Sequence, residues 1–220
     1  MLRYVVLVVM SLTVAFSDGR AQAELSFHAG VHFDRVDHPD RILTNGSSAI
    51  LATKGEASVV GARGGYWFHP ALGLQLDVSR SSNSSWATAP GSSPRLVNFS
   101  GSGAIPSPPP VAPSGLVNRT TYLSVRGIVR TAPGGSFQLF AAAGPALIFH
   151  SGSGTSLLSR NTDPGGVLEA GFRVRVARRV GVELAVSNYL YDSRFIGPAD
   201  GTISDFRDDV LVTPGLVYSW

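Results

Sequence analysis

Charged residues of both signs recur at alternate positions in several short segments, and these side chains have the most obvious capacity for chemistry. If the alternate positions face one shared interior, arginines and carboxylates there can pair with one another, guide ions or exchange protons. The members of this set are Arg63, Asp77, Arg126, Arg130, Glu169, Arg173, Arg175 and Glu183, with Asp34 also on an alternating face. Two uses remain open: a packed ion-pair network that fills the interior, which we expect, or a narrow conducting or proton-active path.

Metal sites receive little support from the remaining polar residues. His28 and His32 are four positions apart, which is roughly 13 Å along a strand and too far for one metal ion. We therefore expect both to be polar filler of the interior. Asp205, Asp208 and Asp209 could offer oxygen ligands to calcium, but we expect them to form a solvated acidic rim. The sequence predicts no cofactor and no metal.

The segments that must position these residues are β-strands. Apolar and polar residues alternate with a period of two, most clearly at the end of the chain, where Leu216, Tyr218 and Trp220 share one face. This period is typical of strands with one apolar face. Eight segments show it: residues 25–34, 60–68, 72–79, 122–130, 137–150, 168–176, 182–187 and 210–220. A soluble sandwich could share this spacing, but it would not expose an uninterrupted apolar set on every strand.

Short and long connections between the segments also alternate. The short ones are residues 69–71, 131–136 and 177–181, and the long ones are residues 35–58, 80–121, 151–166 and 192–208. Short turns at one end and long loops at the other are the pattern of a membrane barrel. We therefore predict an all-β, eight-stranded, antiparallel up-and-down transmembrane β-barrel with four long loops. Residues 80–121, rich in Ser, Gly and Pro, are expected to form a mobile surface loop.

Composition agrees with a barrel in a membrane. Hydrophobic residues make up 44% of the chain and charged residues 15%, below the roughly 25% charged residues of soluble domains. Apolar residues spaced singly along strands produce this balance without a long apolar run. The formal net charge of +3 is too small to argue for a nucleic-acid partner, and the absence of cysteine excludes disulfides and a cysteine-linked lipid anchor.

The N-terminus predicts export. Arg3 precedes a short apolar run, and Ala21 and Ala23 supply the small residues that a signal peptidase reads. Residues 1–23 are therefore expected to be a cleavable signal peptide, with Glu24 first in the mature barrel domain of residues 24–220. The run is shorter than the 17–25 apolar residues that a membrane-spanning helix usually needs.

The segment GGYWFHPALGLQLD at residues 64–77 and the closing VYSW at residues 217–220 resemble the small eight-stranded outer-membrane proteins. This group includes OmpA-type transmembrane domains, OmpX/Ail-type barrels and opacity-type surface proteins. The resemblance implies a bacterial outer-membrane location, short turns on the periplasmic side, and contact with membrane lipid and lipopolysaccharide. It also implies insertion by periplasmic chaperones and the barrel-assembly machinery, which would read the terminal aromatic residue.

Aromatic residues are expected at both membrane interfaces. The periplasmic girdle would comprise Tyr66, Phe68, Phe137, Tyr218 and Trp220, and the opposite rim Phe33, Tyr122, Phe149 and Tyr189. Such girdles are a feature of outer-membrane barrels.

An enzyme is not expected. Barrel deacylases of lipid A carry a histidine two residues before a Ser-Asn pair, whereas Ala185 stands two residues before Ser187-Asn188. A serine without a nearby base is a poor nucleophile. We therefore expect a non-enzymatic, porin-like envelope protein that contributes to envelope integrity and surface display. The alternatives are adhesion or ligand binding through the long loops, and a narrow channel or lipid-modifying enzyme.

Overall fold

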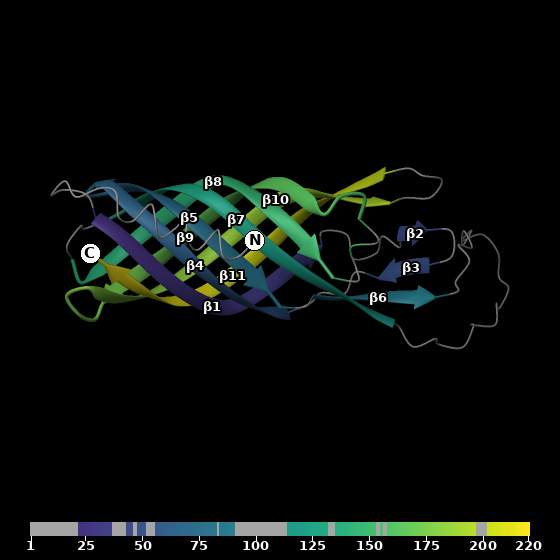
Figure 1. Cartoon of the computed structure of the whole chain (residues 1–220), viewed down its shortest axis with the longest axis horizontal. Coiled ribbons are helices and arrows are strands. Elements are labelled where there is room, and N and C mark those ends of the chain that lie inside the picture. The colour runs from purple at the N-terminus through teal and green to yellow at the C-terminus, as the bar shows by residue number, and fades with distance from the viewer. Residues whose placement is uncertain are drawn as a thin grey trace, which may run out of the picture.

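The computed structural model describes residues 22–36, 43–45, 48–51, 56–82, 84–90, 114–131, 135–152, 155, 158–196 and 202–220. These residues form eleven strands (Figure 1). In chain order they are β1 (Gln22–Val36), β2 (Leu43–Asn45), β3 (Ser48–Leu51), β4 (Glu56–His69), β5 (Leu72–Ser81), β6 (Ser84–Pro90), β7 (Ser114–Arg130), β8 (Phe137–Ser151), β9 (Thr162–Arg175), β10 (Val180–Ile196) and β11 (Thr202–Ser219).

Eight of these strands close into an antiparallel barrel. The order around the barrel is β7-β5-β4-β1-β11-β10-β9-β8, and β8 pairs with β7 to complete the circle. The first barrel strand, β1, pairs with the last, β11, with Glu24 opposite Ser219 and Leu25 opposite Tyr218. The predicted fold class is confirmed. Because closure leaves no unpaired sheet edge, backbone groups are satisfied within the barrel wall.

The three predicted short turns are confirmed, but strands continue into all four segments predicted as long loops. β10 and β11 pair from Asp192 opposite Phe206 to Ile196 opposite Thr202. Within residues 80–121, β6 pairs with the first part of β7, and β3 in turn pairs with β6. Residues 91–113 of that segment lie outside the described residues. The predicted strand ends were wrong because backbone pairing does not require the apolar alternation from which those ends were predicted.

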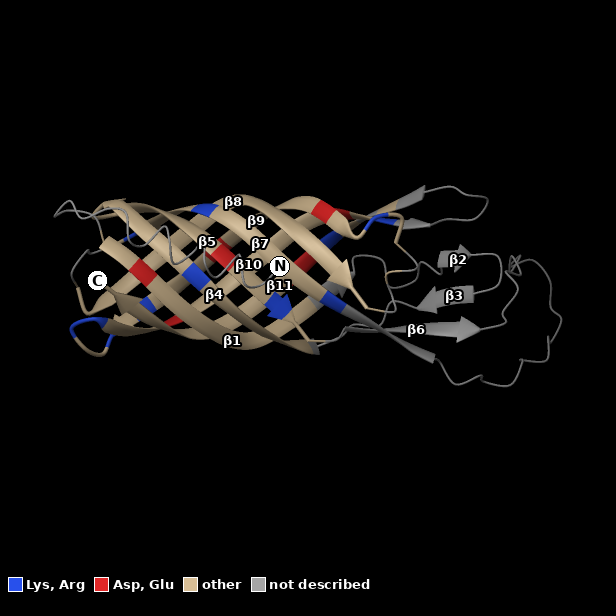
Figure 2. Ribbon diagram, viewed as in Figure 1, with Lys and Arg blue, Asp and Glu red and all other residues tan. Residues whose placement is uncertain are grey.

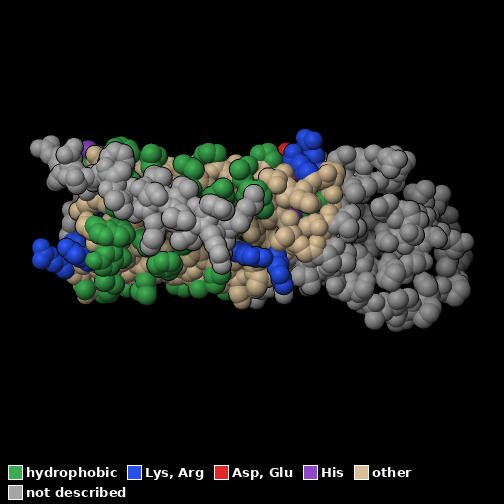
Figure 3. Space-filling view, in the orientation of Figure 1, with side chains coloured by type: hydrophobic (Ala, Val, Ile, Leu, Met, Phe, Trp, Pro, Cys, Tyr) green, Lys and Arg blue, Asp and Glu red, His purple; other side chains and the backbone are tan. Residues whose placement is uncertain are grey.

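Side chains alternate between the two faces of the barrel wall. Val125 is 51% exposed, whereas the next residue, Arg126, is 1% exposed. The outward positions form an apolar surface between the two ends (Figure 3). Among the described residues, no helix is long and apolar enough to cross a membrane. The outward apolar face and the inward polar face are those expected from the sequence.

Backbones approach closely where β7 meets β8. Pairing between the two strands is interrupted here. Ser124 lies opposite Ala146 and Gly127 opposite Ala143, but the positions between them, which include Gly144 and Pro145, are not paired. Proline has no N–H to donate to a sheet ladder. A Cβ added to Gly144 would collide with the carbonyl oxygen of Val125. Glycine is therefore required at this position by the closeness of the two strands.

Replacing Gly144 with valine should reduce barrel stability, because overpacking typically costs about 1–3 kcal/mol. Gly127→Val on the facing strand is the matched control, since a Cβ there would meet its nearest atom, the carbonyl oxygen of Ala143, at 4.0 Å. Urea unfolding of the two variants in detergent gives the comparison. Equal stability of both variants would show that the close approach is not a constraint.

Candidate functional site

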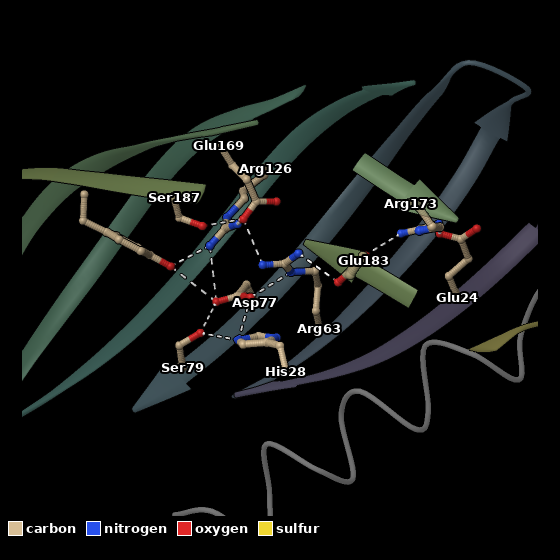
Figure 4. Close-up of polar contacts among 11 residues, drawn as sticks. Glu24, His28, Arg63, Asp77, Ser79, Arg126, Glu169, Arg173, Glu183 and Ser187 are labelled. Atoms are coloured by element: carbon tan, nitrogen blue, oxygen red, sulfur yellow. Dashed lines mark hydrogen bonds and ion pairs between the residues drawn. The ribbon is translucent and has the colours of Figure 1, made fainter. Parts of the chain in front are cut away.

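Arg63 lies at the centre of the polar network in the lumen. Its Nε donates to Asp77 Oδ2 at 3.0 Å, its Nη1 to Glu183 Oε1 at 3.2 Å, and its Nη2 to Glu169 Oε2 at 2.9 Å. The guanidinium on β4 thus links carboxylates from β5, β10 and β9 (Figure 4). All four side chains are at most 3% exposed. One arginine therefore ties together four strands of the barrel wall.

Arg126 on β7 closes the network from the other side. It forms ion pairs with Glu169 and, at 3.2 Å, with Asp77. The same guanidinium donates to the hydroxyl of Tyr189 and, through Nε, to Ser124 Oγ at 2.8 Å. Each of the three nitrogens of both guanidinium groups therefore contacts a carboxylate or a polar side chain of the lumen.

A second group of ion pairs lies nearer the short turns. Arg173 donates to Glu24 Oε2 at 2.7 Å and to Glu183 Oε2 at 2.9 Å, and Arg130 donates to Glu24 Oε1 at 3.1 Å. The Arg130 guanidinium also stacks 3.8 Å above the buried ring of Trp67. Glu183 joins this group to Arg63, so the ion pairs form one continuous chain along the lumen.

The network is balanced in charge. Arg63, Arg126, Arg130 and Arg173 face Asp77, Glu169, Glu183 and Glu24. A buried charge is tolerated when it is paired and hydrogen-bonded, and the equal numbers of each sign satisfy this condition. Charged positions of both signs are visible along the barrel strands in Figure 2.

Sequence reasoning missed Glu24 as a member of the network and assigned it only to the signal cleavage site. Its position has the same parity as Ser26 and His28, so extending the first strand by one residue would have placed it in the lumen. Conversely, Arg175 was expected in the network but lies exposed at the end of β9. Arg175 is the last residue of β9, where the strand ends at the short turn.

The histidines lie in separate polar clusters. His28 Nε2 is 2.9 Å from Ser79 Oγ and 3.8 Å from Asp77 Oδ2. His32 Nε2 is 3.1 Å from the Tyr122 hydroxyl. Within the described part of the chain, no group of three or more metal-binding side chains occurs.

His28, Ser79 and Asp77 have the residue types of a hydrolase triad but not its arrangement. Ser79 Oγ donates to Asp77 Oδ1 at 2.7 Å, so its proton is directed away from the histidine. His28 Nε2 must then be the donor to Ser79 Oγ, and the aspartate does not contact His28 Nδ1, which has no hydrogen-bond partner. A triad needs an unprotonated histidine nitrogen facing the serine hydroxyl, and this geometry does not provide it.

Ser187 is likewise not arranged as a nucleophile. It faces the lumen and donates to Glu169 Oε2, while Ala185 at the position of the deacylase histidine is fully buried. Its hydroxyl serves the ion-pair network.

A third polar cluster occupies the end of the lumen nearer the long connections. Tyr122 and Tyr191 donate from their hydroxyls to Asp209 Oδ2, at 2.6 Å and 2.8 Å. Nearby, Asp163 accepts from Arg160 Nε at 2.6 Å and from Ser193 Oγ at 3.0 Å. Asp209 was predicted to belong to a solvated rim, but it is 1% exposed because the tyrosines cover it. The side chains of Asp34 and Asp205 lie outside the described residues.

The aromatic residues divide between the two faces. Phe68, Phe137, Tyr218 and Trp220 are exposed on the outside near the short turns, and Tyr66 is half-buried. Phe33 and Phe149 are exposed outward, as expected of the opposite rim. Tyr122 and Tyr189 were wrongly placed on that rim. They have the parity of Arg126 and Ser187, and both point into the lumen, where they are fully buried.

The residues of the predicted signal cleavage site lie mostly at the edge of the described chain. Ala21 is outside the described residues, and Ala23 and Glu24 are in β1. The backbone N–H of Trp220 donates to the carbonyl oxygen of Ala23 at 3.1 Å. The start of β1 is therefore held by the residue that follows β11.

No protein-family profile matches the chain, and no curated protein matches its sequence. Solved structures do. The outer membrane protein OprG from Pseudomonas aeruginosa has a TM-score of 0.56 at 13% identity, over 92% of this chain and 98% of that one. Neisserial surface protein A has a TM-score of 0.54 at 11% identity, over 89% and 96%.

The attachment invasion locus protein Ail of Yersinia pestis, solved with the heparin analogue sucrose octasulfate, has a TM-score of 0.50 at 9% identity, over 91% of this chain and 99% of that one. At these identities the likeness concerns the fold. The closed antiparallel barrel with its apolar exterior therefore has the fold of these small eight-stranded outer-membrane barrels.

Proposed function

We propose that this protein is a non-enzymatic, nearly non-conducting outer-membrane barrel that contributes to envelope integrity and displays its long-loop end at the cell surface. The observation that carries the proposal is the charge-balanced network across the lumen. An eight-stranded barrel is only wide enough for side chains to fill it. Here the side chains that fill it are paired with one another from six strands, β1, β4, β5, β7, β9 and β10.

The arrangement of the polar groups supports a plug rather than a catalytic or conducting site. Serine hydroxyls that could act as nucleophiles donate to Asp77 and Glu169 instead. Conduction requires groups that bind an ion and release it, whereas the carboxylates here are held by arginines. Buried hydrophobic side chains, including Tyr122, Ile148 and Leu211, fill the lumen beyond the network.

Export and assembly complete the proposal. Residues 1–23 would direct the chain to the periplasm, where chaperones and the barrel-assembly machinery would receive it. Trp220 is 53% exposed and packs edge-on against Tyr218, with ring centroids 5.2 Å apart. An exposed aromatic pair at the end of the closing strand supports a role as assembly signal and interface anchor.

Adhesion or ligand binding at the long-loop end is the second candidate. Paired strands β10 and β11 continue to Ile196 and Thr202, and β2, β3 and β6 add a further sheet along the first part of β7. Ail, which shares the fold, was solved with a sulfated heparin analogue. A paired sheet at this end could present side chains to an extracellular partner, and binding of heparin-coated beads by cells expressing the protein would support this candidate.

In planar bilayers, the purified barrel should be nearly non-conducting, because paired side chains fill its lumen. Folded protein, identified by its heat-modifiable mobility on gels, is the material for the recording. A steady ion-selective conductance that Arg126→Ala alters without a change in stability would contradict the plug and favour a channel.

Replacing Arg126 with alanine should lower the free energy of unfolding by about 3–5 kcal/mol, because Asp77 and Glu169 would lose a buried partner. Arg80→Ala is the matched control, since Arg80 is exposed on the outer face and surface changes usually stay within about 0.5 kcal/mol. Urea unfolding in detergent measures both. Similar stability of the two variants would contradict an energetic role for the network.

Replacing Trp220 with aspartate should reduce the amount of barrel inserted in the outer membrane far more than deleting residues 101–113. The first change removes the proposed assembly signal and places a charge at the interface, whereas the second shortens a Ser/Gly/Pro-rich segment. Heat-modifiable protein in outer-membrane fractions is the readout. Equal insertion of the two variants would argue against a signal at Trp220.

A further inference from the structure

A cavity of about 410 Å³ opens at the short-turn end of the lumen. Its wall is formed by residues from β1, β7, β8, β9, β10 and β11 and by the turn between β9 and β10. Glu24 and Arg173, which pair with each other in the ion-pair network described above (Figure 4), belong to this wall. The cavity therefore lies where the ion-pair network meets the short-turn end of the barrel.

Positive charge dominates the pocket. The charged side chains in its wall are five arginines and one glutamate: Arg130, Arg173, Arg175, Arg178, Arg179 and Glu24. Glu24 already accepts from both Arg130 and Arg173. Cations therefore outnumber anions in the wall of the pocket. A concave site with one sign of charge and low-dielectric walls concentrates the opposite ion.

Arg173 supplies an independent indication of a ligand. Its side chain is 10% exposed, and its two terminal nitrogens donate to Glu24 and Glu183. Its Nε is buried and has no hydrogen-bond partner among the described residues. A buried donor without a partner is costly, and an acceptor atom within the pocket would satisfy it.

We propose that this pocket binds a small, water-soluble phosphate-bearing anion with at least two negative charges. Guanidinium groups present paired N–H donors that match phosphate oxygens. The cavity falls within the usual range of about 300–1,000 Å³ for small-molecule sites, so it accommodates a phosphoester larger than inorganic phosphate. Lumen-facing residues such as Gln138 line it, whereas the lipid-facing Leu139 does not, which favours a ligand from solution over a lipid headgroup.

Pyrophosphate is the probe, titrated by calorimetry into the folded barrel in an uncharged detergent at low salt. The variant is Arg175→Gln with Arg178→Gln, two exposed residues in the pocket wall. The control is Arg80→Gln with Arg194→Gln, which removes the same charge from exposed positions toward the other end of the barrel. We expect pyrophosphate binding to weaken about tenfold or more in the pocket variant and less than twofold in the control.

Equal weakening in both variants, or no binding by the folded wild type, would overturn the proposal. A second arm places the wild type in nanodiscs of phosphatidylcholine with or without phosphatidylglycerol. Unchanged pyrophosphate affinity supports a soluble ligand, whereas loss of binding with phosphatidylglycerol would assign the site to a lipid headgroup. Neither result affects the conductance test of the plugged lumen, so the two proposals can fail separately.

Discussion

The structure depends on the pairing of buried arginines with buried carboxylates inside a barrel too narrow for bulk water. Arg63 alone contacts carboxylates on three other strands. Such charges would be costly if any of them lacked a partner. Each buried arginine therefore requires a carboxylate at a matching strand position, and each buried carboxylate requires an arginine. A strand shifted by one residue would turn its charged side chains toward lipid, so the network also favours one register.

The outer face obeys a different constraint. Lipid offers no hydrogen bonds, so closure of the sheet satisfies the backbone and apolar side chains cover it. Where β7 and β8 come together, Gly144 allows a backbone approach that a side chain would block. The two faces thus make opposite demands on adjacent residues, as Val125 and Arg126 illustrate. The two ends of the barrel also differ, with a cationic pocket at the short turns and paired strands extending at the other end.

The barrel could be predicted from the sequence because two-residue alternation is imposed directly by lipid on one side and the lumen on the other. The same parity rule would have placed Tyr122 and Tyr189 inside, but their aromatic character was given more weight than their position. The extensions of β10 and β11 could not be predicted in this way, because no apolar face is required outside the membrane. Parity also cannot say which arginine meets which carboxylate. The pairing depends on how far neighbouring strands are shifted along one another around the barrel, which places Arg63 of β4 beside Glu183 of β10.

A double-mutant cycle between Arg126 and Glu169 tests most directly whether these side chains act as one network. The free energy of unfolding would be measured for Arg126→Met, Glu169→Met and the double variant. Each single change leaves the network with one uncompensated buried charge, whereas the double change restores the balance of charge. We therefore expect a loss in the double variant that is smaller than the sum of the two single losses by at least about 1 kcal/mol. Strictly additive losses would contradict the claim that paired charges hold the lumen closed.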